Sequence, residues 1–174
     1  MKMSGVLLGL LTLYVPLTAL AGKVPLAELC VVLAGEWQGT AANPTLAPMA
    51  VSTSVMCSAD KRNIYISVSR GSRFSNSETW WFRQQQDKVL LVYGNGVTED
   101  ITQQLTLYQQ AGSFSFLGEG EINQRPALVQ LQFDPIKASI EQPVAGWQWL
   151  QSAHYLDDDS EQYQVVRALS LLKP

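Results

Sequence analysis

Apolar and polar residues alternate along most of this chain with a period of two. In the stretch 47–57, Met49, Val51 and Val55 fall on one face while Ser52 and Ser54 fall on the other. Alternation of this kind is typical of a β-strand with one buried face. Similar runs begin at Ile64, Trp80, Val89, Ile101, Phe114, Ala127, Trp147 and Tyr163. Together with a strand that begins at Gly35, the pattern predicts about ten strands.

Short turn signals separate these runs, as a meander requires. Asn95-Gly96 suits the positive φ angles of a tight turn, and the polar segment 60–63 and the acidic segment 157–159 indicate further corners. Only Pro25–Val32 has a helical pattern, one or two turns long. We therefore predict an all-β domain that opens with a short helical turn.

Ten consecutive strands with one apolar face each must also hide their edges. A closed up-and-down antiparallel barrel of about eight to ten strands hides them completely, and a two-sheet sandwich is the alternative. The opening strand favours the barrel, because Gly35 and Gly39 allow a sharp bend and a close approach to neighbouring strands. Trp37 lies between them, and we expect its ring to fill the closed end of the barrel.

A helical turn followed by Gly35-Glu36-Trp37 resembles the start of proteins of the calycin superfamily, which includes the lipocalins and small secreted bacterial lipocalin-like domains. The resemblance implies that Arg167, on the last predicted strand, stacks its guanidinium across Trp37. Seven residues follow Arg167, so we expect no helix after the barrel. This favours the helix-free bacterial lipocalin-like domains over the vertebrate carriers.

The N-terminal segment 1–21 has the pattern of a secretory signal peptide. Lys2 precedes an apolar run over 6–15, and Ala19 and Ala21 form a small-x-small cleavage site. An uncleaved membrane anchor is the alternative, but Pro16 interrupts the run well short of the ~20 apolar residues that a span needs. We expect 22–174 to form one soluble, exported domain, periplasmic or secreted, without stable membrane insertion.

The net charge limits the kinds of partner that the protein can bind, and the cysteines indicate its redox compartment. Without Lys2, the remaining 11 basic and 15 acidic residues give a formal net charge of −4, which argues against nucleic acid as a partner. Cys30 and Cys57 are the only cysteines, and in an exported protein they predict one disulfide. Such a bond stabilises the fold by on the order of 3 kcal/mol. Two free buried thiols, or a two-cysteine metal site, are the alternatives.

The sequence offers little catalytic chemistry. It contains no Gly-x-Ser-x-Gly motif, and a Ser-His-Asp arrangement would have to use His154, the only histidine. An alternative interpretation is a haem-binding barrel, because the first strand, Gly35-x-Trp37-x-Gly39, is similar to that of nitrobindin. Haem needs an axial ligand, and His154 is the only histidine that could supply it. The residues after His154 do not reproduce the expected histidine-bearing stretch. We therefore predict a non-catalytic protein without cofactor or metal.

Inward aromatic residues leave two function classes open. Candidate ligand-binding residues, all expected to point inward, are Glu78, Trp80, Phe82, Tyr93, Phe116, Trp147 and Trp149. They could line a pocket for a small apolar molecule, or they could simply fill the core. In the second case the protein is an interaction or enzyme-inhibitor barrel with a protein partner. A packed interior, with Trp81 in an exposed apolar patch, would favour that second class.

Overall fold

The computed structural model describes residues 20–70, 76–137 and 144–174. The predicted signal peptide, 1–21, lies almost entirely outside the described residues. The first elements are β1 (Gly22–Lys23), α1 (Leu26–Leu33), β2 (Gly35–Asn43), β3 (Leu46–Cys57), β4 (Asn63–Arg70) and β5 (Asn76–Gln85). The chain continues with β6 (Lys88–Gly94), β7 (Ile101–Gln110), β8 (Ser113–Ile122), β9 (Arg125–Ile136), β10 (Gly146–Tyr155) and β11 (Gln164–Leu172).

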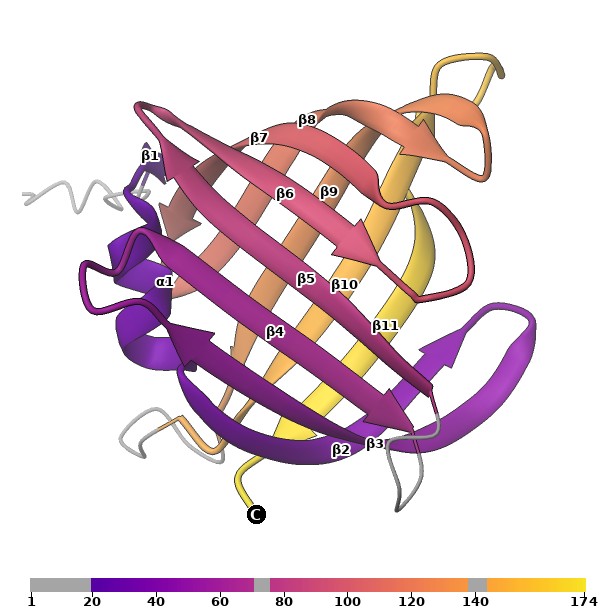
Figure 1. Cartoon of the computed structure of the whole chain (residues 1–174). Helices are drawn as coiled ribbons and strands as arrows, with labels where there is room; N and C mark the ends of the chain where they lie inside the picture. Colours follow the sequence, from indigo (N-terminus) through magenta and orange to yellow (C-terminus); the bar gives the residue numbers. More distant parts are fainter. Residues whose placement is uncertain (1–19, 71–75, 138–143) are drawn as a thin grey trace, which may run out of the picture.

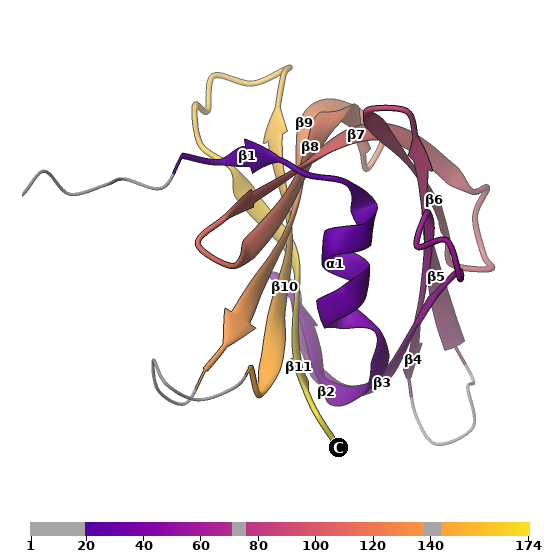
Figure 2. The same cartoon turned by 90° about the vertical axis from the view of Figure 1, so that its left-hand side faces the viewer.

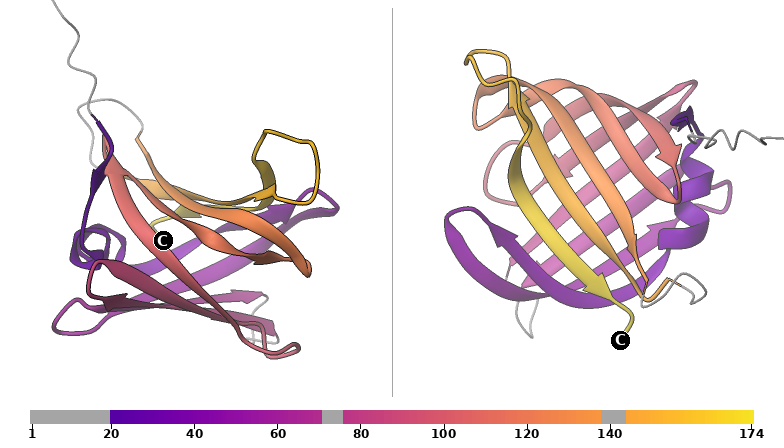
Figure 3. Two further views of the ribbon diagram at one scale, coloured as in Figure 1. Left: turned by 90° about the horizontal axis from the view of Figure 1, so that it is seen from above. Right: turned by 180° about the vertical axis from the view of Figure 1, so that it is seen from behind.

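Strands β2 to β11 form a closed barrel (Figures 1 and 3). Each strand pairs antiparallel with the next along the chain, and β11 pairs antiparallel with β2, which closes the sheet. The short strand β1 extends the sheet beside β7. The predicted all-β, closed up-and-down barrel with a short N-terminal helix is therefore confirmed, and the sandwich alternative is wrong.

Aromatic rings fill the interior of the barrel. Phe82 and Phe116 stack with ring centroids 4.7 Å apart, and Phe133 and Trp149 stack at 5.0 Å. Trp80 meets Trp149 edge-on at 4.8 Å. All five side chains are at most 2% exposed. Because aromatic side chains bury 150–250 Å² each, these rings form much of the apolar core that holds the barrel together.

Helix α1 lies across one end of the barrel (Figure 2). Leu26, Leu29 and Leu33 are fully buried there, and the Trp37 indole Nε1 donates a hydrogen bond to the carbonyl oxygen of Leu33 at 2.9 Å. The disulfide between Cys30 and Cys57 ties the helix to β3. The predicted helix and the predicted disulfide are both confirmed, and together they close this end.

Gly39 allows β2 to approach β11 closely. A Cβ atom at this position would lie 1.7 Å from the carbonyl oxygen of Ser170, far inside contact distance. Gly35 has φ +134°, a conformation that L side chains rarely adopt. The two glycines that flank Trp37 are therefore required by the backbone, as the sequence predicted.

The expected stacking of Arg167 on Trp37 is wrong, and the strand register explains why. Ala168 pairs with Ala42 of β2, which is five residues, or about 17 Å of strand, from Trp37. The cation near Trp37 is instead Lys173, whose Nζ lies 5.9 Å from the ring centroid. Arg167 belongs to the opposite end of the barrel.

Candidate functional site

The end of the barrel opposite α1, which we call the mouth, gathers charged side chains from three strands. Arg70 is the last residue of β4, Glu78 lies near the start of β5, and Arg167 lies near the start of β11. Each is in phase with buried residues of its own strand, so each points inward. The closed barrel brings these three together although Glu78 and Arg167 are 89 residues apart in the sequence.

Glu78 bridges the two arginines of the mouth. Its Oε1 accepts a hydrogen bond from Arg70 Nη2 at 3.3 Å, and its Oε2 contacts Arg167 Nη1. The Glu78 side chain is 15% exposed, against 39% for Arg70 and 24% for Arg167. Glu78 thus pairs with both guanidinium groups from the strand that lies next to β4 in the sheet.

Arg167 also covers the outermost aromatic rings of the core. Its Cζ lies 5.7 Å from the Trp80 ring centroid and 5.8 Å from that of Tyr93, within the range of cation–π attraction. Trp80 and Tyr93 are themselves 4.4 Å apart. A small pocket of about 30 Å³ lies beside the two arginines, and its other lining residues are Ala41, Ala42, Asn43, Ala47 and Met49.

The predicted ligand-binding residues separate into two groups. Glu78, Trp80 and Tyr93 meet at the mouth. Phe82, Phe116, Trp147 and Trp149 lie in the packed core, to which Trp80 also belongs, and all five are at most 2% exposed. The residues proposed to line an interior pocket thus fill the space that an apolar ligand would need.

Three indole nitrogens of the interior lack a hydrogen-bond acceptor. The Nε1 atoms of Trp80, Trp147 and Trp149 are buried without a partner. A buried donor without an acceptor costs about 1–3 kcal/mol. Of these three tryptophans, Trp80 is the one whose ring lies within cation–π distance of Arg167.

The outer face of β3 to β6 carries a transverse row of apolar and aromatic side chains. The register places Met56 beside Tyr65, Tyr65 beside Trp81, and Trp81 beside Val92. We call these four residues the outer row. Met56 is 61% exposed and Tyr65 is 43% exposed. The outer row is therefore a surface feature and not part of the core.

Trp81 is held rigidly in the centre of the outer row. Its ring stacks on Tyr65 with centroids 5.1 Å apart, and the Arg83 guanidinium lies 4.4 Å from its centroid. The indole Nε1 donates a hydrogen bond to Asn63 Oδ1 at 3.2 Å. The outward direction expected for Trp81 is confirmed. Sequence reasoning missed Met56 and Tyr65, although Tyr65 alternates with the inward Ile64 and Ile66.

His154 lies away from the aromatic core. Its neighbours Ala153 and Tyr155 are buried, whereas its own ring meets the exposed ring of Tyr163 edge-on at 5.8 Å. The alternation along β10 therefore places His154 on the outer side of the strand. Among the described residues there is also no group of three or more His, Cys, Asp or Glu side chains that could hold a metal ion.

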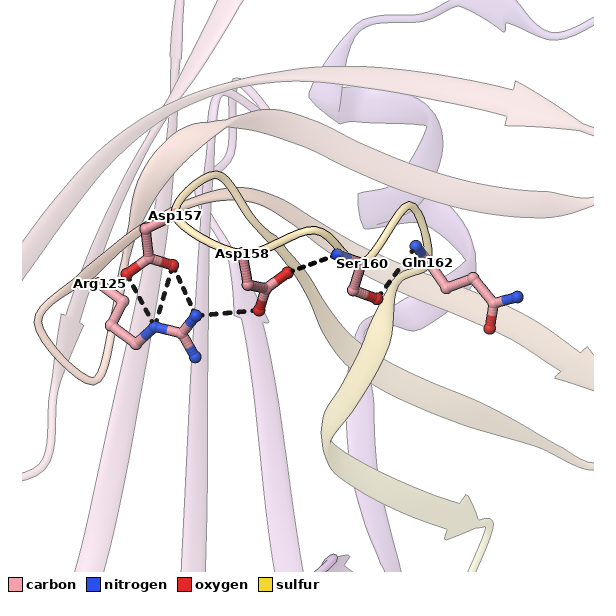
Figure 4. A network of polar contacts seen from close by, with 5 residues as sticks. All are labelled: Arg125, Asp157, Asp158, Ser160 and Gln162. Carbon is pink, nitrogen blue, oxygen red and sulfur yellow. Dashed lines mark hydrogen bonds and ion pairs between the residues drawn. The ribbon is translucent and has the colours of Figure 1, made fainter.

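The acidic segment near His154 forms a surface network with Arg125 (Figure 4). Arg125 Nη2 contacts Asp157 Oδ1 at 2.6 Å and Asp158 Oδ2 at 2.9 Å. The hydrogen bonds from Arg125 hold the pKa of Asp157 below its usual value. Since Arg125 begins β9 while the two aspartates follow β10, the network fastens the loop between β10 and β11.

Comparison with known proteins identifies the fold but no family. No family model and no curated protein matches this chain. The chain is similar to the crystal structure of Rv2717c from M. tuberculosis, with a TM-score of 0.54 and 12% sequence identity, over 88% of this chain and 99% of that chain. A likeness at this identity supports a shared barrel fold alone. In the described residues no helix is long and apolar enough to cross a membrane.

Proposed function

We propose that this protein is an exported, non-catalytic interaction barrel that binds a protein partner through the outer row. The packed aromatic interior is the observation that carries the proposal. Trp80, Phe82 and Phe116 already contact other rings at 4.4 to 4.8 Å, so the barrel acts as a rigid support. Carriage of a small apolar molecule inside the barrel would require this core to open.

The composition of the outer row suits a protein interface. Tyr, Trp, Met and Arg are enriched where proteins meet, and this row offers Met56, Tyr65, Trp81 and the adjacent Arg83. Stacking and hydrogen bonding already fix Trp81. Its side chain therefore loses little conformational entropy when a partner covers it.

The proposal also includes export of the protein and a relationship with bacterial lipocalin-like domains. The pattern of 1–21 supports a signal peptide, and the Cys30–Cys57 bond suits an oxidising compartment. The helix followed by Gly35-x-Trp37 and the closed barrel support a relationship with bacterial lipocalin-like domains. Lys173, rather than the expected Arg167, supplies the cation near Trp37.

Site-specific photocrosslinking in the native host tests this proposal. A photoreactive residue at Met56 should give one discrete adduct with another protein, and the same residue at Gln148 on the outer face of β10 should not. Trp81→Ala, combined with the probe at Met56, should abolish the adduct while the protein remains folded. Adducts that are equal at both positions, or that do not depend on Trp81, would contradict the proposal.

A further inference from the structure

We propose that residues 118–122 of β8 are a docking site for an extended peptide segment of a partner protein, with basic side chains at alternate positions of the peptide. We call these residues the β8 edge. The peptide adds one strand to the wall of the barrel. The outer row belongs to β3 to β6, so the β8 edge is a separate surface and the inference does not depend on the proposed function.

Strands β7 and β8 pair along only half of their length. The ladder between them stops at Thr106 and Leu117. Beyond this point, among the described residues, 101–105 of β7 pair with β6 alone and 118–122 of β8 pair with β9 alone. The two strands diverge away from their hairpin (Figure 3, left). One side of the β8 edge is therefore unpaired.

The β8 edge directs backbone hydrogen-bonding groups into the gap between β7 and β8. The carbonyl oxygen of Glu121 accepts a hydrogen bond from Gln103 Nε2 of β7 at 3.4 Å, so Glu121 presents its backbone toward β7. Alternate residues of a strand present N–H and C=O to the same side, so Glu119 does the same. Pro126 lies opposite Glu121 on β9 and has no N–H to donate to it. An added strand can pair with these backbone groups.

The gap has a floor on the inside and space on the outside. A Cβ atom at Gly118 would lie 2.3 Å from the carbonyl oxygen of Gln104, so the two strands are close there before they separate. The buried Gln103 side chain spans the gap on the side of the barrel interior. A cavity of about 510 Å³ adjoins the point of separation, and its lining includes Leu117, Leu128 and Tyr163. An added strand therefore lies over the gap without entering the packed core.

Two exposed carboxylates on the β8 edge determine the charge of the peptide. Glu119 and Glu121 alternate with inward residues and are exposed. Neither side chain has an ion pair or a hydrogen bond with another described residue. Charged side chains on a free edge discourage pairing with apolar strands. The same two charges favour a strand that carries basic side chains.

The cations near the β8 edge already have partners of their own. Lys88 lines the same cavity, and its Nζ donates a hydrogen bond to Thr106 Oγ1 at 2.9 Å. Arg125 lies opposite the end of the β8 edge, where it pairs with Asp157 and Asp158. The two glutamates are therefore the charges that remain for a peptide to contact.

Strand geometry then gives the sequence pattern of the peptide. Outward side chains of an added strand lie directly opposite Glu119 and Glu121, where opposite charges stabilise the pairing. Their aliphatic stems can lie on apolar cavity residues such as Leu117. Inward side chains face Gly118 and Gly120, and a Cβ at Gly120 would already lie 2.5 Å from Gln103 Nε2. The matching pattern is basic, small, basic.

An NMR titration of the mature protein with the capped peptide Lys-Val-Lys-Val-Lys tests the proposal. We expect saturable shifts of the Glu119 and Glu121 amide signals and slower hydrogen exchange of both amides. Two control peptides should bind much more weakly. Glu-Val-Glu-Val-Glu reverses the charge, and methylation of the backbone nitrogen of the central lysine keeps the charge but removes one N–H donor.

Two variants of the protein separate local contact from net charge. Glu119→Lys should weaken binding of the basic peptide by on the order of fivefold. Glu28→Lys changes the net charge by the same amount on α1, and it should leave the affinity unchanged. Native-like spectra of both variants without peptide establish that the fold is intact.

Several results would overturn the proposal. One is the absence of saturable shifts, or shifts that lie away from the β8 edge. Equal binding of the methylated peptide would mean that charge alone attracts the peptide, and equal effects of Glu119→Lys and Glu28→Lys would mean the same. A dimer of the protein alone that Glu119→Lys abolishes would assign the β8 edge to a second copy of this chain instead of a partner peptide.

Discussion

Replacement of Phe116 by alanine tests whether the barrel interior is a packed core. Phe116 is fully buried, stacks on Phe82 at 4.7 Å and meets Phe133 edge-on at 6.2 Å. Loss of its ring leaves a void on the order of 100 Å³, which at ~24 cal/mol per Å³ costs about 2 kcal/mol. The lost burial of the phenyl group adds about 2 kcal/mol. We therefore expect Phe116→Ala to lower the free energy of unfolding by about 4 kcal/mol.

Urea unfolding, followed by tryptophan fluorescence and far-UV circular dichroism, measures this loss. The midpoint should fall while the slope m stays constant, because the surface exposed on unfolding is nearly the same. Val92→Ala, in the outer row, is the matched control and should cost less than about 1 kcal/mol. A loss for Phe116→Ala as small as that of the control would refute the reasoning, because it would mean that the interior has room to spare.

Three further predictions concern the closed end, the strand contact and the surface network. Cys30→Ser with Cys57→Ser should lower the free energy of unfolding by on the order of 3 kcal/mol, measured by urea unfolding, and an unchanged midpoint would show that the bond does not constrain the chain. Gly39→Ala should sharply reduce the yield of folded protein, because its Cβ would overlap the backbone of β11; a native melting temperature would contradict this. Arg125→Gln should raise the pKa of Asp157 toward its usual value. In the native protein, the stability that this ion pair contributes is fully present above the unfolded-state pKa of Asp157 and is lost as pH falls through its folded-state pKa. An NMR titration that gives the same pKa of Asp157 in the variant and the native protein would disprove the pairing.

The alternation of residues was sufficient to predict the strands and their faces. The inward positions of Trp80 and Phe82 and the outward position of Trp81 follow from a period of two, and the structure confirms all three. The helix over Leu26–Leu33 and its bond to β3 were also predictable. These features are local, or depend on the one possible pairing of two cysteines.

Features that depend on register could not be predicted in the same way. The expected contact of Arg167 with Trp37 failed because pairing of β11 with β2 fixes which end of the barrel each residue reaches, and the pattern of one strand does not contain this information. The partnership of Glu78 with Arg70 and Arg167 has the same origin. Likewise, the pattern assigns Phe116 and Trp149 to the interior, but only the packing of rings from several strands shows that the interior is filled.

The most direct test of the central claim is mass spectrometry of the mature protein purified from its native host, first intact and then denatured. If the packed barrel acts as a rigid support for its outer surface, the denatured protein should release neither a stoichiometric apolar molecule nor haem, and the chain mass should be two hydrogens lower for the Cys30–Cys57 bond. Release of about one equivalent of an apolar molecule would contradict the account, because it would mean that the interior opens around a ligand.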